Sequence, residues 1–329
     1  MGADHARIVA SELPGATLQV VCDASAARAH AVADETGAAD AATDPLAVIA
    51  RSDVDAVLIA SPDETHAALT IAALEAGKRV LCEKPLAPGS DDCLRVIEAE
   101  VKTGRRMIQI GFMRRFDQSY QEMKDALDGG LIGAALMFHC FHRNVSAPAH
   151  FTGQMAISNS APHEFDAARF MLDAEYTSIS AFQPKGADTS KAGAPVFMVL
   201  ETTGGQLVNI EVNNNAAYGY DVRGELVGEK GTVVLRAPVH SEINLALMRS
   251  EPYPADWRPR FAEAYRRQNR AWLKAIRSGV ASDIAASAWD GYCASLVAEV
   301  AVASLAQGRR MPVTLAPKPD IYAGTGHRT

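Results

Sequence analysis

One lysine of this sequence stands where its charge can act on a bound molecule. Lys84 follows the apolar run 79–82 and Glu83, and it precedes Pro85. If that run is a buried strand, the ammonium group lies at the carboxyl edge of a sheet, where it can donate to a hydroxyl group and stabilise a negative oxygen. The alternative is a solvated surface lysine. The position of Lys84 therefore predicts a catalytic role.

A second candidate is Asp23, which ends the apolar run LQVVCD (18–23). An acid at the end of the second strand of a dinucleotide-binding sheet accepts hydrogen bonds from both ribose hydroxyls of the adenosine and repels the extra phosphate of NADP. This placement favours NAD as the cofactor. The alternative is that Asp23 only caps the helix that starts near Ser25.

The elements that position these residues follow from the pattern of the first third of the chain. Apolar runs of strand length alternate there with amphipathic stretches of helix length, and the expected strands are 18–23, 55–61, 79–83 and 107–112. Such alternation predicts βα units on a parallel sheet that is covered on both faces. Gly37, Gly77 and Gly104 fall where the intervening helices should end. We expect an α/β, Rossmann-type nucleotide-binding domain over residues 1–112.

The remainder, residues 113–329, has longer strand-like runs and predicts an α+β substrate-binding domain. Its expected strands lie within 134–143, 195–213, 220–236 and 243–249. Glycine-rich turns between them suggest an antiparallel sheet whose strands follow one another as hairpins. The stretch 286–308 is apolar on all sides and predicts a helix packed between the domains. Only the residues after Pro317 look loosely ordered.

The glycine-rich turn that should hold the pyrophosphate is largely missing from the chain as given. That turn belongs about 20 residues before the ribose-binding acid. Here the sequence opens Met1-Gly2-Ala3-Asp4-His5, so Gly2 resembles the last glycine of G-x-G-x-x-G without its predecessors. We expect the first strand and two glycines to be absent, through a late start codon or a truncation, and NAD binding by this form to be weak. The alternative is that Gly2 is a flexible terminus.

Length, charge and cysteine content narrow the class of protein. A chain of 329 residues exceeds the usual limit of one hydrophobic core, which predicts two domains. The net charge of −7 and the dispersed lysines and arginines argue against a nucleic-acid partner, and no apolar run is long enough for a membrane. Five widely spaced cysteines predict neither a disulfide framework nor a metal site, and read as mostly buried hydrophobes. Without a signal peptide pattern, a soluble cytoplasmic protein is expected.

A resemblance to a known family runs through nearly the whole chain. It is carried by SPDETHAALTIAALEAGKRVLCEKPLA (61–87), GFMRRFD (111–117), NSAPHEFDAARFML (159–172) and SAWDGY (287–292). These segments resemble the glucose–fructose oxidoreductase/inositol dehydrogenase family (Gfo/Idh/MocA), above all its inositol 2-dehydrogenases. The resemblance implies an N-terminal Rossmann domain, a C-terminal domain with an open-faced sheet, NAD as cofactor, and homodimers or homotetramers built through that sheet.

The resemblance also implies roles for residues of the first domain. Glu83 and Lys84 are expected close to the nicotinamide, Met113 is expected beside the cofactor, and Arg114 beside the substrate. The loop beside the cofactor is implied to consist of Ser61, Pro62, Asp63 and His66, with Gly2 at the pyrophosphate. For His66 the alternative is a role in the core or at the start of a helix. Pro85 is implied to fix the turn after Lys84, through a cis peptide as in relatives.

In the second domain the resemblance implies that His163 takes the proton from the hydroxyl being oxidised. Relatives carry an aspartate four residues before this histidine on the same helix, and an unperturbed imidazole, with a pKa of about 6.5, suits a base near neutrality. Here position 159 is Asn159, which can bind a hydroxyl or imidazole but cannot stabilise imidazolium as a carboxylate does. Asp166 can compensate, or it is a structural acid. Asn144 and Tyr220 are implied to bind substrate, with ordinary structural roles as the alternative.

These residues together predict NAD-dependent oxidation of a cyclic polyol, an inositol, to its ketone. His163 is the expected base, Lys84 stabilises the alkoxide, and the cofactor accepts the hydride. One alternative is an NAD(P)-dependent dehydrogenase of an aldose or another sugar. A second alternative, of a different class, is a non-catalytic sugar or nucleotide sensor. The Asn159 change and the missing glycine loop favour a sensor. The retention of Lys84 and His163 argues against it.

Overall fold

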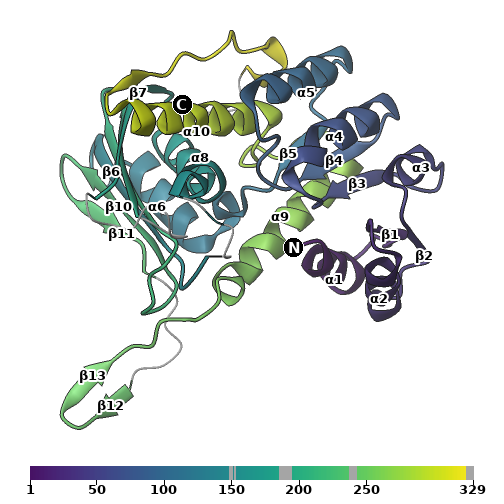
Figure 1. Cartoon of the computed structure of the whole chain (residues 1–329), viewed down its shortest axis with the longest axis horizontal. Coiled ribbons are helices and arrows are strands. Elements are labelled where there is room, and N and C mark those ends of the chain that lie inside the picture. The colour runs from purple at the N-terminus through teal and green to yellow at the C-terminus, as the bar shows by residue number, and fades with distance from the viewer. Residues whose placement is uncertain (148–150, 152, 185–194, 237–242, 324–329) are drawn as a thin grey trace. The chain divides into compact units, whose positions relative to one another are not determined.

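The computed structural model describes residues 1–147, 151, 153–184, 195–236 and 243–323. Contacts within the chain divide it into two compact units (Figure 1). The first unit comprises Met1–Phe116, Ala264–Ser295 and Ala316–Thr329, and the second comprises Asp117–Glu263 and Leu296–Leu315. The first unit is therefore discontinuous in sequence, because its N-terminal part is completed by segments from near the end of the chain.

The strands of the first unit form two parallel sheets. Strands β1 (Val20–Cys22) and β2 (Asp40–Ala42) pair with each other, and β3 (Ala56–Ile59), β4 (Arg79–Cys82) and β5 (Ile108–Ile110) form a three-stranded sheet in that order. The four predicted strands are confirmed, whereas β2 was not predicted. Within the described residues no strand joins the two sheets. Every residue of β5 is buried, as are the last three residues of β4.

Helices follow these strands as the alternating pattern predicts. They are α1 (Gly2–Glu12), α2 (Ala26–Thr36), α3 (Pro45–Ala50), α4 (His66–Glu75) and α5 (Ser90–Lys102). Gly37, Gly77 and Gly104 have φ angles of 70°, 73° and 72°, a left-handed conformation that glycine adopts without steric cost. They stand just beyond α2, α4 and α5, which confirms the predicted helix ends.

Two late helices contribute residues to both units, namely α9 (Arg258–Ser278) and α10 (Ala288–Gln307). The predicted late helix is thus present, and its packing between the domains stays a prediction. Beyond it, the expectation of loose order after Pro317 is wrong for Tyr322. That side chain is completely buried, and its hydroxyl donates to the Glu100 carboxylate at 2.5 Å. Residues 324–329 lie outside the described part of the chain.

The second unit is built on a seven-stranded sheet with the order β11-β10-β6-β9-β8-β7-β14. Its strands are β6 (Ala135–Arg143), β7 (Tyr176–Phe182), β8 (Val196–Thr202), β9 (Leu207–Asn213), β10 (Asp221–Gly228), β11 (Thr232–Val234) and β14 (Met311–Pro312). All neighbours are antiparallel except β6 and β9, which are parallel. The expectation that strands follow one another as hairpins holds for β8–β9 and β10–β11. It is wrong for β6, which lies between β9 and β10.

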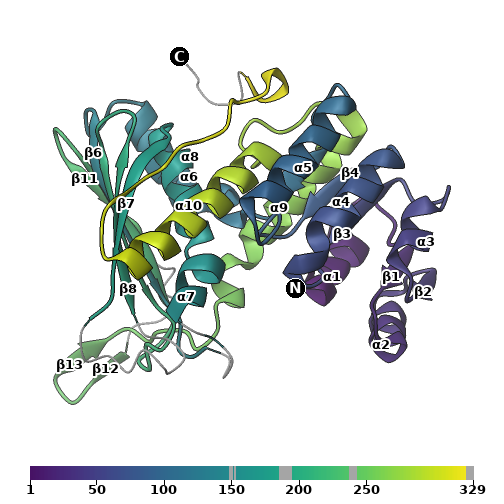
Figure 2. The same ribbon diagram turned by 45° about the horizontal axis from the view of Figure 1, so that its top comes forward.

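One face of this sheet is covered and the other is open. Helices α6 (Gln118–Asp128) and α8 (Pro162–Leu172) lie on the covered face (Figure 2). The open face exposes large apolar side chains such as Phe197 and Leu207. The predicted open-faced, mostly antiparallel sheet is therefore confirmed.

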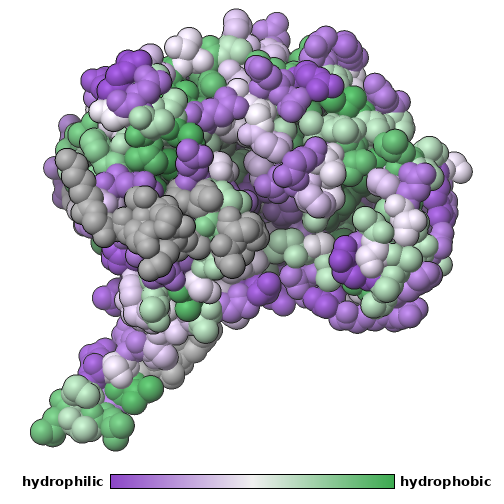
Figure 3. Space-filling model, in the orientation of Figure 1, coloured by the Kyte–Doolittle hydropathy of each residue, from purple (hydrophilic) through white to green (hydrophobic). Residues whose placement is uncertain are grey.

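The expected strand at 243–249 belongs to none of these three sheets. It forms a separate hairpin of β12 (Ile243–Leu245) and β13 (Met248–Ser250), whose tip exposes Leu245, Leu247 and Met248 (Figure 3). The alternation of apolar and polar residues in this segment is typical of a strand with one buried face, but all six paired residues of the hairpin are exposed. An apolar strand pattern therefore did not identify a core strand here.

Candidate active site

The carboxyl ends of the parallel strands bring several predicted residues to one edge of the first unit. Asp23 follows β1, Ser61 lies just beyond β3, and Glu83 and Lys84 follow β4. Helix α1 begins at Gly2, and a Cβ atom built on Gly2 would lie 3.8 Å from the Cβ of Ala60, next to the end of β3. The N-terminal N–H groups of α1 therefore point to this edge, where they suit a pyrophosphate.

This arrangement fits NAD. A helix N-terminus and an acid after a neighbouring strand are the groups that a dinucleotide needs at the carboxyl edge of a parallel sheet. Gly2 stands in the first turn of α1 rather than in a flexible terminus. The residues present can thus hold the two ends of the ADP moiety.

Asp23 is already engaged by its own helix. Its Oδ1 accepts hydrogen bonds from Arg28 Nη2 at 2.7 Å and from the Ser25 backbone N–H at 2.8 Å. The Arg28 guanidinium lowers the pKa of the Asp23 carboxyl, and the Ser25 N–H adds to that effect. The N-cap of α2 is Ser25 and not Asp23, so simple helix capping does not describe Asp23.

Lys84 is half-buried at the end of a buried strand, and the Lys84–Pro85 peptide is cis, as the resemblance implied. Its backbone N–H donates to Glu83 Oε2 at 3.3 Å, and the other Glu83 oxygen lies 2.8 Å from Nε2 of His5. Glu83 itself is 6% exposed. The Lys84 backbone is therefore bound by a buried carboxylate and does not belong to a solvated loop.

His66 is a fully enclosed link between two loops of the same edge. Its Nδ1 lies 2.6 Å from the carbonyl oxygen of Pro85, and its Nε2 lies 2.9 Å from the carbonyl oxygen of Ser61. Carbonyl oxygens only accept, so both hydrogen bonds form together only when both ring nitrogens carry protons. His66 also begins α4, which supports the structural alternative for this residue.

The loop between β3 and α4 is stabilised by a hydrogen bond between two of its own side chains. The Ser61 and Thr65 hydroxyls are 2.5 Å apart, and Pro62 precedes the 3₁₀ turn Asp63–Thr65. Met113 and Arg114 lie in another 3₁₀ turn, Met113–Phe116, beyond β5, and each is 2% exposed. These predicted residues all stand after strands of the same sheet.

In the second unit His163 and Asn159 do not share one α-helix, which corrects the expectation from their spacing. Asn159 belongs to a π-helical turn, Ala156–Ser160, and His163 lies in the first turn of α8. The N–H of Ala161 bonds to the carbonyl of Ala156, five residues back, so the simple i, i+4 geometry does not apply. Such π-turns occur often at functional sites. His163 is 9% exposed, and Asp166, three residues along α8, is 1% exposed.

A hydrogen-bonded network surrounds the predicted substrate residue Asn144. Its Nδ2 donates to Asn214 Oδ1 at 2.8 Å and to Nε2 of His142 at 3.2 Å. His142 Nδ1 in turn lies 2.9 Å from Glu164 Oε2, and Ser160 lies 3.0 Å from the Asn214 amide nitrogen. Both amide hydrogens of Asn144 are thus used inside the protein. Its Oδ1 accepts from no described residue, which leaves it available to a substrate hydroxyl.

Tyr220 stands immediately before β10 and is 6% exposed. Its ring meets Phe261 edge to face, with centroids 6.5 Å apart, and its backbone N–H donates to the carbonyl of Pro254. These contacts fit the structural alternative for the ring.

Several engaged residues were not predicted from the sequence. The sequence predicted no role for His5, His142 or Glu164. A signal for His142 existed, because Phe138, Cys140 and His142 are the inward positions of an alternating strand. A histidine in such a row needs polar partners. The cysteine prediction also needs one correction, because Cys22 is exposed while the other four are buried and all five are free.

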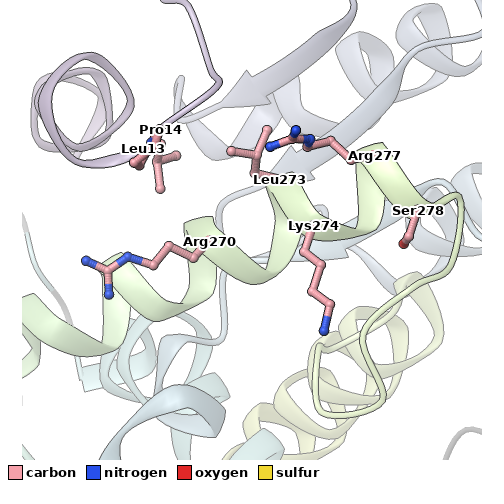
Figure 4. A pocket seen from close by; sticks show the side chains of 7 residues that line it. All are labelled: Leu13, Pro14, Arg270, Leu273, Lys274, Arg277 and Ser278. Carbon is pink, nitrogen blue, oxygen red and sulfur yellow. The ribbon is translucent and has the colours of Figure 1, made fainter.

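A hollow of the first unit lies away from these residues. It has a volume of about 460 Å³ and is lined by Leu13, Pro14, Arg270, Leu273, Lys274, Arg277 and Ser278, five of them from α9 (Figure 4). None of the predicted site residues lines it. No helix in the described ranges is both long and apolar enough to cross a bilayer.

Comparison with known proteins identifies the family. Residues 1–112 match the model of the Gfo/Idh/MocA oxidoreductase family, NAD-binding Rossmann fold, and residues 120–234 match the Gfo/Idh/MocA C-terminal domain. The chain belongs to the Gfo/Idh/MocA family. The expectations of an oxidoreductase, a Rossmann domain and NAD as cofactor are thereby confirmed.

Individual relatives agree over nearly the full length. The chain is 45% identical to inositol 2-dehydrogenase 2 of Saccharopolyspora erythraea, covering 98% of this chain and 95% of the relative. It is 42% identical to inositol 2-dehydrogenase of Streptomyces avermitilis, covering 98% and 94%. Among solved structures, myo-inositol dehydrogenase of Lactobacillus casei in complex with NAD(H) and myo-inositol superposes with a TM-score of 0.93 at 29% identity, covering 98% and 96%.

Proposed function

We propose that this Gfo/Idh/MocA oxidoreductase oxidises one CH–OH group of a cyclic polyol of the inositol class, forming the ketone and NADH. The observation that carries the proposal is the position of Lys84. Its ammonium-bearing side chain is half-buried at the carboxyl end of β4, on the edge where NAD fits. The names of the full-length relatives supply the substrate class.

Two residues are proposed to handle the substrate oxygen. His163 removes the hydroxyl proton, and Lys84 donates a hydrogen bond to the oxygen as negative charge develops on it. Bound NAD supplies the hydride acceptor. Asn159 is proposed to bind or orient the substrate hydroxyl through its amide, because it cannot supply the negative charge of a carboxylate.

The cofactor is proposed to be held at the strand edge by residues of the first unit. Asp23 takes the adenosine ribose, exchanging part of its contact with Arg28 for the two hydroxyls. Gly2 takes the pyrophosphate at the start of α1. The nicotinamide side is assigned to Ser61, Pro62, Asp63, His66, Glu83, Lys84 and Met113.

Substrate hydroxyls are proposed to meet Asn144, Arg114 and Tyr220. Asn144 has the sharpest support, because its amide group is fixed by two donated hydrogen bonds and presents Oδ1 as an acceptor. A polyol ring needs several such partners, since a buried polar group without one is costly. We further propose a cytoplasmic homodimer or homotetramer that uses the open sheet face, where Phe197 and Leu207 are exposed.

The test is NADH formation by the purified chain with inositol epimers, aldoses and both NAD and NADP. Lys84→Ala and His163→Ala should each lower kcat/KM by at least 100-fold, while exposed Lys102→Ala and His30→Ala should not. Near wild-type oxidation by either site variant would refute the assignment. Turnover of aldoses alone would favour the sugar dehydrogenase alternative, and polyol binding without turnover would favour a sensor.

A further inference from the structure

His5 is a buried histidine to which the proposed reaction gives no role. It lies on α1, one turn beyond Gly2, and is only 1% exposed. Its Nε2 lies 2.8 Å from Oε1 of Glu83, the residue before Lys84. The helix that presents its N-terminus to the cofactor is thus joined to the end of β4 by a side-chain hydrogen bond.

The imidazole of His5 is fixed from its other side by α9. Asn269 Nδ2 donates to Nδ1 of His5 at 3.0 Å. The rings of His5 and Tyr265 pack edge to face, with their centroids 5.5 Å apart. A carboxylate oxygen accepts hydrogen bonds, so the hydrogen bond between His5 and Glu83 uses an N–H at Nε2. That N–H therefore donates to the Glu83 carboxylate.

The Glu83 carboxylate is confined on its remaining sides. Its Oε2 accepts from the Lys84 backbone N–H at 3.3 Å. A Cβ atom at Gly111 would lie 2.8 Å from the carboxyl carbon and from both oxygens, so the carboxylate occupies space that only glycine leaves open. The Glu83 carboxylate is thus held on three sides. His5 contacts one oxygen, the Lys84 backbone N–H contacts the other, and Gly111 lies beside the group. These contacts determine where Glu83 and the Lys84 backbone lie.

We propose that His5 is a positioning residue for Lys84 and acts through Glu83. The inference rests on the proposed catalytic role of Lys84. His5 holds the carboxylate, the carboxylate holds the Lys84 amide, and the side chain of Lys84 starts from a fixed backbone. A misplacement of about 1 Å in a reacting group can lower the rate by about 100-fold. Loss of His5 should therefore lower kcat more than it raises the KM for NAD or polyol.

The experiment compares His5→Ala, His5→Gln and Gly111→Ala with a matched control, Tyr322→Phe. The control removes another buried hydrogen bond to a carboxylate, that of Glu100, in the same unit. Steady-state kinetics should show kcat lowered by roughly 10–100-fold for His5→Ala and Gly111→Ala, with KM values changed less than about threefold. His5→Gln, whose amide N–H can reach Glu83, should stay within about fivefold of wild type.

A second readout is independent of turnover. Amide hydrogen exchange of the peptide spanning residues 82–87 should be faster in His5→Ala than in wild type and unchanged in Tyr322→Phe, because only the first releases the Lys84 amide. If His5→Ala does not fold, the Gln variant and Gly111→Ala decide by the same two measurements.

The outcomes separate this inference from the proposed function. Wild-type kcat and exchange in His5→Ala, with Lys84→Ala inactive, would overturn the positioning role and leave the function standing. Equal losses of kcat in His5→Ala and Tyr322→Phe, in proportion to lost thermal stability, would show a merely structural role. Activity retained by Lys84→Ala would refute the proposed function, while faster exchange in His5→Ala would still establish the link to the Lys84 backbone.

Discussion

Replacing His142 by phenylalanine should destabilise the second unit strongly. The change removes the hydrogen bond from Nδ1 to Glu164 and the acceptor for the Asn144 amide. A hydrogen bond to a charged group contributes about 1.5–3 kcal/mol and a neutral one about 0.5–1.5 kcal/mol. Glu164 is 1% exposed, so its carboxylate cannot turn to water instead. We expect a loss of about 3 kcal/mol in the free energy of unfolding.

Thermal unfolding followed by circular dichroism measures this loss. For a unit of this size about 3 kcal/mol corresponds to a midpoint lowered by about 6–12 °C. The matched double variant His142→Phe/Glu164→Leu removes the buried charge as well, and it should recover more than half of the loss. The KM for polyol should rise in both variants, because Asn144 loses the partner that orients its Oδ1. A midpoint within 2 °C of wild type for the single variant, or a double variant no more stable than the single one, would contradict the reasoning.

Three further predictions concern other parts of the molecule. Burial raises the pKa of Glu100, so the stabilising contribution of this residue is present below the unfolded pKa and is lost as pH rises through the folded pKa. Melting curves from about pH 4 to 8 should therefore show the stability of Glu100→Gln increasing relative to that of wild type. A stability difference that stays constant with pH would refute this. Asp23→Ala should lower the ratio of KM for NADP to KM for NAD at least tenfold in initial-rate assays, and an unchanged ratio would exclude Asp23 as the ribose ligand. Gly228→Ala should cost about 1–3 kcal/mol in denaturant titrations, because its Cβ would lie 2.3 Å from the Ile132 carbonyl oxygen, whereas Gly231→Ala, whose nearest neighbour atom is 3.7 Å away, should be tolerated.

The strands and helix ends of the first unit were predicted well because apolar runs and glycines mark them within a few residues of sequence. The runs at 55–61, 79–83 and 107–112 became strands, and the glycines after the helices took the left-handed conformation that ends a helix. What completes that unit is not local. Asn269 contacts His5, which lies 264 residues earlier in the chain, and no spacing of residues in the sequence predicts such a contact.

The sheet of the second unit shows the same limit. The hairpins β8–β9 and β10–β11 follow from short turns, but the parallel pairing of β6 with β9 depends on how distant strands pack. Burial, not periodicity, separates β12 and β13 from the sheet strands. The π-turn at Asn159 was likewise not predicted, because a single turn whose hydrogen bond spans five residues instead of four leaves the sequence pattern helical.

His5 in the first unit and His142 in the second share one arrangement that no pattern in the sequence revealed. In each, an asparagine amide donates to one ring nitrogen and the other ring nitrogen donates to a carboxylate: Asn269–His5–Glu83 in one unit and Asn144–His142–Glu164 in the other. An imidazole used in this way gives a buried carboxylate a hydrogen-bond donor, and it fixes the amide at the same time. In the first unit the carboxylate end contacts the backbone of Lys84. In the second the amide end belongs to Asn144, whose Nδ2 also donates to Asn214. The same arrangement of side chains therefore adjoins the lysine that we propose as catalytic in one unit and the asparagine that we propose as a substrate ligand in the other.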